Sequence, residues 1–507
     1  SRDGDATPGA LPDIGAYEAQ AAPTVSNPNP IVVTTAADEA DPNGTLGVGI
    51  SLREALRDGG GLGSIIFDAA LSGQTITLSS SLGDLVIEKS VSIDASSLAG
   101  GVTITRDGTG VFRLFTVLPG KTANLAGLTL TGGEGGGQNL TTTGGAFQNA
   151  GTLTLTSCTL SGNSATDGGA IFNQGTLTLV RCTLSGNQTN TAAGLHRGGA
   201  IHHASGTLSL NNCMLEQNSC VGDGGAIYLF TGTATLANCT LSANSVTDGN
   251  GGAILSAGVL TLTDCTLSNN RAFWSNGFAD SGVGGAIANT GGTLTLTGCT
   301  FAGNATAKTA AELSTPIFDG SARGGAIYNF GTVPALTNCT FVGNSSTGDG
   351  GAICNFGPLT ITHGTFAGNF INNGDPAANG FAGNGGAISV LGGTLSLGYS
   401  IVAGNASVSG PDLHKPASGG GTITPVGTNL IGKNNTVMTE FPQGPLVGIE
   451  ASPVPANLDP LGDYGGPTQT MRPQPGSLAI DAATGSSTTT DQRGNARPTD
   501  GDGNRSE

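Results

Sequence analysis

The chain has 507 residues, a formal net charge of −17 and only 5% aromatic residues, whereas glycine alone fills 87 positions. So many glycines and so few large side chains argue against a conventional globular core and favour a repetitive architecture with narrow layers. Acidic residues number 35 against 18 basic ones. This excess would repel a phosphate backbone, so nucleic acid is excluded as an expected partner.

The composition also bears on where the protein is found. No apolar run reaches the roughly 18 residues that a membrane span needs, and no charged and then apolar leader opens the chain. Charged residues make up only 10% of a chain rich in threonine, serine, asparagine and glycine. We therefore expect a soluble, already processed protein that is extracellular or at a cell surface, without a membrane span.

Two predicted segments precede the repetitive part. Residues 1–30 form an N-terminal extension that carries the sequence from Asp13 to Glu18. Residues 31–63 form a cap, in which Ser51 and Glu54 have the spacing of a capping box that opens a short amphipathic helix. Gly59 and Gly60 would end this helix, which we expect to cover the open first coil.

Residues 64–433 are predicted to form an all-β, right-handed parallel β-helix. A motif that opens with a glycine pair and closes with asparagine recurs nine times, and the offset between the two is always 19 or 20 residues. Polar and apolar residues alternate in its Thr-Leu-Thr-Leu stretch, as is typical of strands. The length of the repeat would fit three short strands per coil. Coils must stack about 4.8 Å apart, with the usual right-handed crossover. The glycine pairs begin at Gly144, Gly168, Gly198, Gly224, Gly251, Gly284, Gly324, Gly350 and Gly385.

Two side chains recur in register, and both patterns favour a structural interpretation. The closing asparagines would stack at a turn and bond neighbouring backbone. Seven cysteines share one repeat position and are expected to be small buried thiols, with disulfides between neighbouring coils as the alternative. The asparagines are Asn163, Asn187, Asn218, Asn244, Asn270, Asn304, Asn344, Asn369 and Asn405, and the cysteines are Cys158, Cys182, Cys213, Cys239, Cys265, Cys299 and Cys339.

The repeats differ in length at one place. Between a closing asparagine and the next glycine pair lie 4 residues after Asn163 but 19 after Asn304. All insertions should therefore leave the rod at one corner. One of the longest contains Phe273, Trp274 and Phe278, which either pack on their own rod or contact a ligand or a neighbouring subunit.

Catalysis is not expected. Asp167, Asp223, Asp248 and Asp349 each stand shortly before a glycine pair, where a turn is a better explanation than a carboxylate pair of a hydrolase. The one histidine cluster is expected in a solvated loop rather than at a metal site; it contains His196, His202 and His203. A polysaccharide lyase or hydrolase is accordingly the least favoured function.

No cofactor is expected, with calcium as the open alternative at two acidic stretches. Asp500, Asp502 and Asn504 offer alternating oxygen ligands, although Arg505 stands where a calcium loop would turn on glycine. The second stretch, with its solvated-loop alternative, contains Asp38, Glu39, Asp41 and Asn43.

Motifs at both ends resemble known families. Gly49 to Leu56 resembles the N-terminal Cys-Ser-Leu-Arg-Glu-Ala signature of secreted proteins, with Ile50 in place of the cysteine. Residues 434–507, with the motif starting at Asp491, resemble the choice-of-anchor Q module. The glycine-pair repeats are also similar to those of chlamydial polymorphic membrane proteins, which implies display at a cell surface. The C-terminal motifs are Asn429-Leu430-Ile431, Asp459-Pro460-Leu461, Gly465-Gly466-Pro467-Thr468, Pro475-Gly476-Ser477, Ala479-Ile480-Asp481 and Asp491-Gln492-Arg493-Gly494.

One departure from the resembled module suggests self-assembly. The module ends in a segment that here stands at the start of the chain, so the resemblance implies that Asp13–Glu18 packs beside Asp491–Pro498. About a dozen coils of roughly 4.8 Å would separate these parts by some 60 Å, and the connector 19–30 reaches only about 40 Å. We therefore predict pairing between chains and a head-to-tail homopolymer. The predicted interface residues are Asp13, Ile14, Gly15, Ala16, Tyr17, Glu18, Asp491, Gln492, Arg493, Gly494, Arg497 and Pro498.

Two alternatives to the filament stay open. The first is an adhesin or a glycan-binding β-helix that contacts glycans or cell surfaces. The second is a tandem array in which the same contact is covalently continuous.

Overall fold

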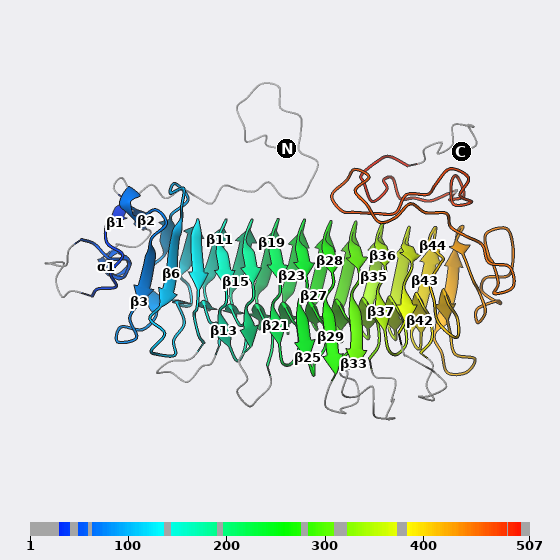
Figure 1. Cartoon of the computed structure of the whole chain (residues 1–507), viewed down its shortest axis with the longest axis horizontal. Helices are drawn as coiled ribbons and strands as arrows, with labels where there is room; N and C mark the ends of the chain where they lie inside the picture. The colour runs from blue at the N-terminus through cyan, green and yellow to red at the C-terminus, as the bar shows by residue number, and fades with distance from the viewer. Residues whose placement is uncertain are drawn as a thin grey trace, which may run out of the picture.

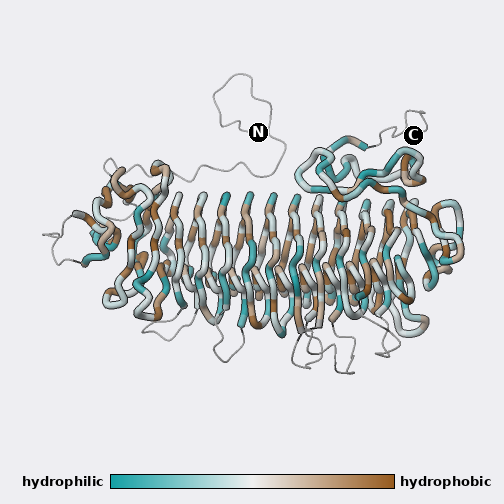
Figure 2. Tube along the Cα trace, viewed as in Figure 1, coloured by the Kyte–Doolittle hydropathy of each residue, from teal (hydrophilic) through white to brown (hydrophobic). Residues whose placement is uncertain are grey.

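The computed structural model describes residues 30–40, 49–58, 63–135, 143–189, 196–274, 282–308, 322–372, 383–483 and 485–497, except for the side chains of Trp274 and Lys308. Within these residues the chain winds as a right-handed parallel β-helix, a rod of stacked coils (Figure 1). The predicted fold class is confirmed. In Figure 2 short hydrophobic and hydrophilic segments alternate through the body of the rod.

The largest sheet, sheet A, contains the repeated Thr-Leu-Thr-Leu stretches. Its 14 strands, in spatial order, are β1 (Ile31–Val33), β2 (Gly63–Phe67), β5 (Val91–Asp94), β8 (Thr122–Ala126), β11 (Thr152–Thr156), β15 (Thr176–Val180), β19 (Thr207–Asn211), β23 (Thr233–Ala237), β27 (Val259–Thr263), β31 (Thr293–Thr297), β35 (Thr332–Thr337), β39 (Pro358–Thr362), β43 (Thr394–Gly398) and β46 (Thr422–Val426).

Sheet B follows sheet A around each coil, after the corner that holds the cysteines. Its 13 strands are β3 (Thr75–Leu78), β6 (Val102–Arg106), β9 (Leu128–Thr131), β12 (Thr159–Ser161), β16 (Thr183–Ser185), β20 (Met214–Glu216), β24 (Thr240–Ser242), β28 (Thr266–Ser268), β32 (Thr300–Ala302), β36 (Thr340–Val342), β40 (Thr365–Ala367), β44 (Ile401–Val402) and β47 (Leu430–Ile431).

Sheet C contains the residues that follow the glycine pairs. Its 12 strands are β4 (Leu85–Ile87), β7 (Phe115–Val117), β10 (Phe147–Asn149), β14 (Ile171–Asn173), β18 (Ile201–His203), β22 (Ile227–Leu229), β26 (Ile254–Ser256), β30 (Ile287–Asn289), β34 (Ile327–Asn329), β38 (Ile353–Asn355), β42 (Ile388–Val390) and β45 (Leu413–His414).

The expectation of three strands per coil was incomplete. Residues that follow the closing asparagines pair with those of neighbouring coils and form a fourth sheet, sheet D, of very short strands. Its eight strands are β13 (Ser164–Ala165), β17 (Gln188–Thr189), β21 (Ser219–Cys220), β25 (Ser245–Thr247), β29 (Arg271–Trp274), β33 (Ala305–Lys308), β37 (Ser345–Ser346) and β41 (Phe370–Ile371).

The first coil is closed by the predicted helix, α1 (Leu52–Asp58). Its capping box is confirmed, because the Ser51 amide donates to Glu54 Oε2 (2.9 Å) and the Glu54 amide donates to Ser51 Oγ (3.2 Å). Leu52 and Ala55 are buried in the core of the rod. Ile31–Val33 already pairs with β2, so the first strand of the rod lies inside the predicted cap.

The last coil is also covered by the chain itself. The Ile431 amide donates to the Leu446 carbonyl (2.8 Å), and the Gly448 amide donates to the Ile431 carbonyl (2.9 Å). Val437 and Phe441 extend the buried core at this end. The last coil is therefore covered without a strand from a second subunit.

The closing asparagines form a buried column, as predicted. Each Nδ2 donates to Oδ1 of the next asparagine at 2.9 to 3.0 Å, and each backbone amide donates to the same oxygen. The nine cysteines are all free and buried, as expected. Cys182 Sγ, for example, donates to the carbonyls of Leu155 (3.3 Å) and Val180 (3.4 Å).

The outer side of sheet A is unusually uniform between β8 and β31. These seven strands pair without a register shift, and their first, third and fifth residues point outward in three columns that we call the threonine face. Fourteen of its 21 residues are threonine, and none is charged or aromatic. The other seven are Asn124, Ala126, Val180, Ser209, Asn211, Ala237 and Val259.

Candidate functional site

The residue that precedes each glycine pair lies at the corner between sheets D and C. The next residue must be glycine: Gly168, for example, has φ +65°, and an added Cβ would lie 2.1 Å from the Ile171 carbonyl oxygen. Parallel bridges join Asp167 to Arg197 and Arg197 to Asp223, one coil after another. The backbone thus places two carboxylates and one guanidinium in a row, at steps of about 4.8 Å.

Aromatic side chains lie beside this charged row on the outer face of sheet C. The His202 ring packs edge-on between Phe172 and Tyr228, with ring centroids 4.9 and 5.0 Å away. Tyr228 stacks on Phe230 at 6.3 Å, and Arg197 Cζ lies 5.3 Å from the centroid of the Tyr228 ring. The side chain of Phe230 is 51% exposed.

A second group of the same kind lies three coils further along sheet C, about 14 Å away. Phe356 contacts Tyr328 and Phe330 with ring centroids 5.6 and 6.1 Å apart, and Arg323 Cζ lies 5.7 Å from its centroid. Phe330 is 61% exposed. We call both groups together the aromatic strip, which consists of Phe172, His202, Tyr228, Phe230, Tyr328, Phe330 and Phe356.

Burial changes the ionisation of the charged row. It raises the pKa of Asp223, against the opposing effects of the Asn250 hydrogen bonds and Arg197. Burial also raises the pKa of the Tyr228 hydroxyl, which Arg197 counteracts. His202 Nδ1 lies 3.6 Å from Asp167 Oδ1, which is too long for a hydrogen bond.

The expectation of a solvated histidine loop was wrong. His202 and His203 belong to β18, and the exposed fractions of His196, His202 and His203 are 7%, 5% and 0%. The alternation of strand residues turns His203 into the rod, where its Nδ1 lies 2.8 Å from Asn173 Nδ2. Among the described residues, no group of three or more histidine, cysteine or acidic side chains could hold a metal ion.

The residues predicted for the C-terminal half of a subunit interface contact the chain's own rod. Gln492 is 8% exposed and donates to the hydroxyls of Thr300 (3.0 Å) and Thr468 (2.9 Å), while Thr340 Oγ1 donates to its Oε1 (2.8 Å). Figure 1 shows this part of the chain running back along the rod. Thr300 lies on the coil of β31, nine coils or about 43 Å from β1, where the connector 19–30 joins the rod.

That position weakens the geometric argument for pairing between chains. The predicted separation of about 60 Å assumed a C-terminal module beyond the last coil, whereas the separation of about 43 Å exceeds the roughly 40 Å reach of the connector 19–30 by little. Pro498 and the predicted partner segment Asp13–Glu18 lie outside the described residues.

The other predicted interface residues have partners close in sequence or on the rod. Arg493 Nε donates to Asp491 Oδ2 (2.8 Å), and Gly494 has φ +84° in the turn that follows. Arg497 bonds His363 on the rod. Burial, followed by the effect of Arg497, lowers the pKa of His363 to about 4.

The loop and calcium candidates are described only in part. Phe273 is half-buried in β29, between Thr247 and Ala307 of neighbouring coils, and Trp274 ends the strand. Phe278 and the side chain of Trp274 lie outside the described residues.

Asp38 uses its carboxylate for structure rather than leaving it free for calcium. Its oxygens accept from Arg53 (2.7 and 2.9 Å) and from the Ser79 amide (2.8 Å). The neighbouring Glu39 offers its backbone carbonyl to Ser51. The remaining calcium candidates, Asp41, Asn43, Asp500, Asp502 and Asn504, lie outside the described residues.

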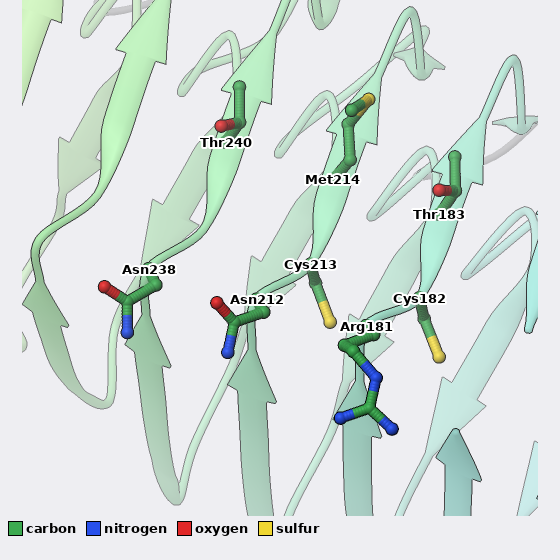
Figure 3. Close-up of a pocket in the computed structure, with 8 residues that line it drawn as sticks. All are labelled: Arg181, Cys182, Thr183, Asn212, Cys213, Met214, Asn238 and Thr240. Carbon is green, nitrogen blue, oxygen red and sulfur yellow. The ribbon is translucent and has the colours of Figure 1, made fainter. Parts of the chain in front are cut away.

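A shallow depression of about 240 Å³ lies on the corner between sheets A and B. Figure 3 shows Arg181, Asn212 and Asn238 at equivalent positions of successive coils, beside the outward residues of sheet B. The C-terminal module occupies the continuation of this corner, where Thr468 Oγ1 donates to the Gly298 carbonyl (2.6 Å) and Asn338 Nδ2 to the Thr490 carbonyl (2.9 Å).

The aromatic strip was missed by sequence reasoning, although a signal was present. The second residue after the Gly-Gly-Ala of each repeat points outward from sheet C, and in four copies it is aromatic or histidine: Phe172, His202, Tyr228 and Tyr328. An alignment of the copies by their glycine pairs would have shown this column.

The fold and the repeats define a parallel β-helix repeat protein. Residues 157–174 and 338–355 match the model of the Chlamydia polymorphic membrane protein repeat. No curated protein matches the chain. A solved structure described as a new PL6 alginate lyase complex with trisaccharide is similar, with 12% identity, a TM-score of 0.45, and 89% of this chain and 92% of that chain covered. At this identity and TM-score the likeness carries no statement about activity.

The helical part of the described chain is too short to span a membrane. α1, which is the single α-helix among the described residues, has 7 residues, and no helix in that part of the chain could cross a bilayer.

Proposed function

We propose that the protein is a non-catalytic rod, extracellular or at a cell surface, that binds glycans through the aromatic strip. The observation that carries this proposal is the placement of Phe230 and Phe330, which are 51% and 61% exposed on the same face three coils apart. Isolated exposed apolar residues need no explanation, but aligned exposed rings backed by further rings are typical of a contact surface.

The charged row beside the strip supports a polar ligand. Arg197 and Arg323 each lie over a ring of the strip, with Cζ 5.3 and 5.7 Å from the ring centroids. Asp167 and Asp223, which are partly exposed, add carboxylate acceptors at the same corner. An extended chain of sugar rings offers apolar faces to the aromatic side chains and hydroxyls to these charged groups.

The segments of variable length join the rod at this same corner, between sheets D and C. Coils of constant length with one corner of variable length are the usual arrangement for a solenoid that binds through its loops. The similarity of two repeats to the chlamydial polymorphic membrane protein repeat supports a location at a cell surface.

The proposal is tested with fluorescently labelled protein on an array of immobilised polysaccharides, peptidoglycan included. The double variant Phe230→Ser/Phe330→Ser should lose most of the binding seen with the wild type. Val259→Ser is the matched control, because Val259 is 45% exposed on a different sheet and should leave binding unchanged. Equal binding by all three proteins, or none by the wild type, would refute the proposed role of the strip.

The absence of catalysis is part of the proposal and has its own test. Polysaccharides that the wild type binds should yield no new reducing ends and no unsaturated products on prolonged incubation. Product formation that Asp167→Asn or Arg197→Ala abolishes would instead make the protein a lyase or hydrolase.

Head-to-tail assembly stays a second prediction that rests on the resemblance of the terminal motifs. It requires Asp13–Glu18 of one chain to reach Asp491–Arg497 of another. Negative-stain electron microscopy and light scattering distinguish long fibres from single rods. Monomeric rods at high protein concentration would exclude the filament without affecting the glycan proposal.

A further inference from the structure

The threonine face is a two-dimensional lattice, and this regularity restricts what can bind it. Its columns repeat at about 4.8 Å along the rod and at about 6.7 Å along each strand. The in-register pairing is first interrupted at β35, where the register shifts around Pro334. A flexible chain, or a protein surface without such a repeat, has no match in two directions, whereas a crystalline ligand does.

The threonine face is broader and less interrupted than the other outward surfaces of the rod. Sheet B also has outward threonines, such as Thr159 and Thr240, because threonine is favoured in strands. That column is interrupted at Met214, and from Thr300 onward it contacts the C-terminal module. The outward column of sheet C has Thr116 as its single threonine among the described strands. Among the described strands, sheet A alone presents three neighbouring columns without interruption over seven coils.

The chemistry of the face suits a neutral lattice of hydrogen-bonding groups. Each threonine offers one hydroxyl and one methyl group, and the hydroxyls of Thr176 and Thr207 lie 3.4 Å apart across neighbouring strands. The columns lack charge in a protein of net charge −17, while Lys121, Arg181 and Asp264 stand just beyond the strand ends. Aromatic rings, which would stack on the sugars of a crystalline polysaccharide, are absent from the columns.

We propose that the threonine face binds ice. Water between regularly spaced methyl and hydroxyl groups is held in ordered positions, and the entropy cost of ordering is small on a surface that is already rigid and periodic. Ice is a neutral crystal of hydrogen-bond donors and acceptors, which matches the chemistry of the face. This inference concerns a different sheet from the aromatic strip and does not depend on it.

The test compares the wild type with a variant on the face and a variant beside it. Thr235→Lys places a charge in the central column, where the side chain is exposed, and Met214→Lys places the same charge at an exposed position on sheet B of the preceding coil. Circular dichroism checks that all three proteins are folded. The wild type and Met214→Lys should enter a growing ice hemisphere and show a thermal hysteresis gap, and Thr235→Lys should lose both.

Several outcomes would overturn the proposal. Exclusion of the wild type from ice would do so, as would equal behaviour of the two lysine variants. Binding to microcrystalline cellulose but not to ice would assign the face to a polysaccharide crystal. Association of wild-type rods that Thr235→Lys abolishes, without ice binding, would make the face a contact between copies of the chain.

Discussion

Asp412 ends the asparagine column by accepting from Asn405, whose Nδ2 lies 2.8 Å and whose backbone amide lies 3.2 Å from Asp412 Oδ1. Its second oxygen accepts from the Lys433 amide. A carboxylate thus replaces the next asparagine at the end of the column, where it is 0% exposed. Burial raises the pKa of Asp412 to about 6.

The stability of the rod should therefore depend on pH through Asp412. A carboxyl whose folded pKa is raised contributes stability that is fully present below the unfolded value of about 4 and is lost as the pH rises through about 6. A shift of about 2 units corresponds to roughly 3 kcal/mol. Asp412→Asn should remove this dependence, so the thermal midpoint of the wild type should fall relative to that of the variant as the pH rises from about 4 to about 7.

The column itself should contribute strongly to stability. Asn244 donates to the Leu215 carbonyl (2.9 Å) and to Asn270 (3.0 Å), and it accepts from Asn218. Asn244→Ala leaves several buried groups unpaired, at a cost of about 1 to 3 kcal/mol for each group. Asn211→Ala, at an exposed position, should change the unfolding midpoint in urea by far less. Similar midpoints for both variants would contradict this role.

Gln492 should hold the C-terminal module on the rod. Gln492→Ala removes its bonds to Thr300, Thr340 and Thr468 and leaves these hydroxyls facing an apolar methyl group. Limited proteolysis should then cut within residues 457–497 while the rod stays resistant, because coils contact only their neighbours. The exposed Gln474→Ala is the control and should keep the wild-type digestion pattern.

The core should tolerate little change. Leu179 is 0% exposed between Leu155 and Leu210 of adjacent coils. Leu179→Ala should cost about 2 to 5 kcal/mol, and Leu179→Asp should cost more because it buries an unpaired charge. Thr178→Ala, on the outer side of the same strand, should cost less than about 1 kcal/mol. Urea unfolding followed by circular dichroism measures these differences.

The cysteines should behave as thiols in the native protein. The nine side chains are free and buried, so a thiol reagent should react with them only after denaturation. A reducing agent should leave the thermal midpoint unchanged. A fall in the midpoint under reducing conditions would show that neighbouring coils are joined by disulfides.

The sequence by itself determined the coil. Constant spacing between glycine pairs and closing asparagines, with strand alternation between them, leaves stacking as the only way to bury Leu153, Leu177 and their equivalents. The capping box at Ser51 and the asparagine and cysteine columns follow from the same local patterns. These features depend on periodicity and on neighbours one coil away, so they can be predicted from the chain.

Tertiary structure alone decided what lies on the surface of the rod. The return of Gln492 to Thr300 joins residues 192 positions apart, and no repeat predicts which hydroxyls on sheet B it will bond. Aligned repeats place His202 between Phe172 and Tyr228, but only the packed structure shows that this position buries the His202 ring. Such contacts arise between coils and across long sequence separations, where the local pattern of one repeat carries no information about the partner.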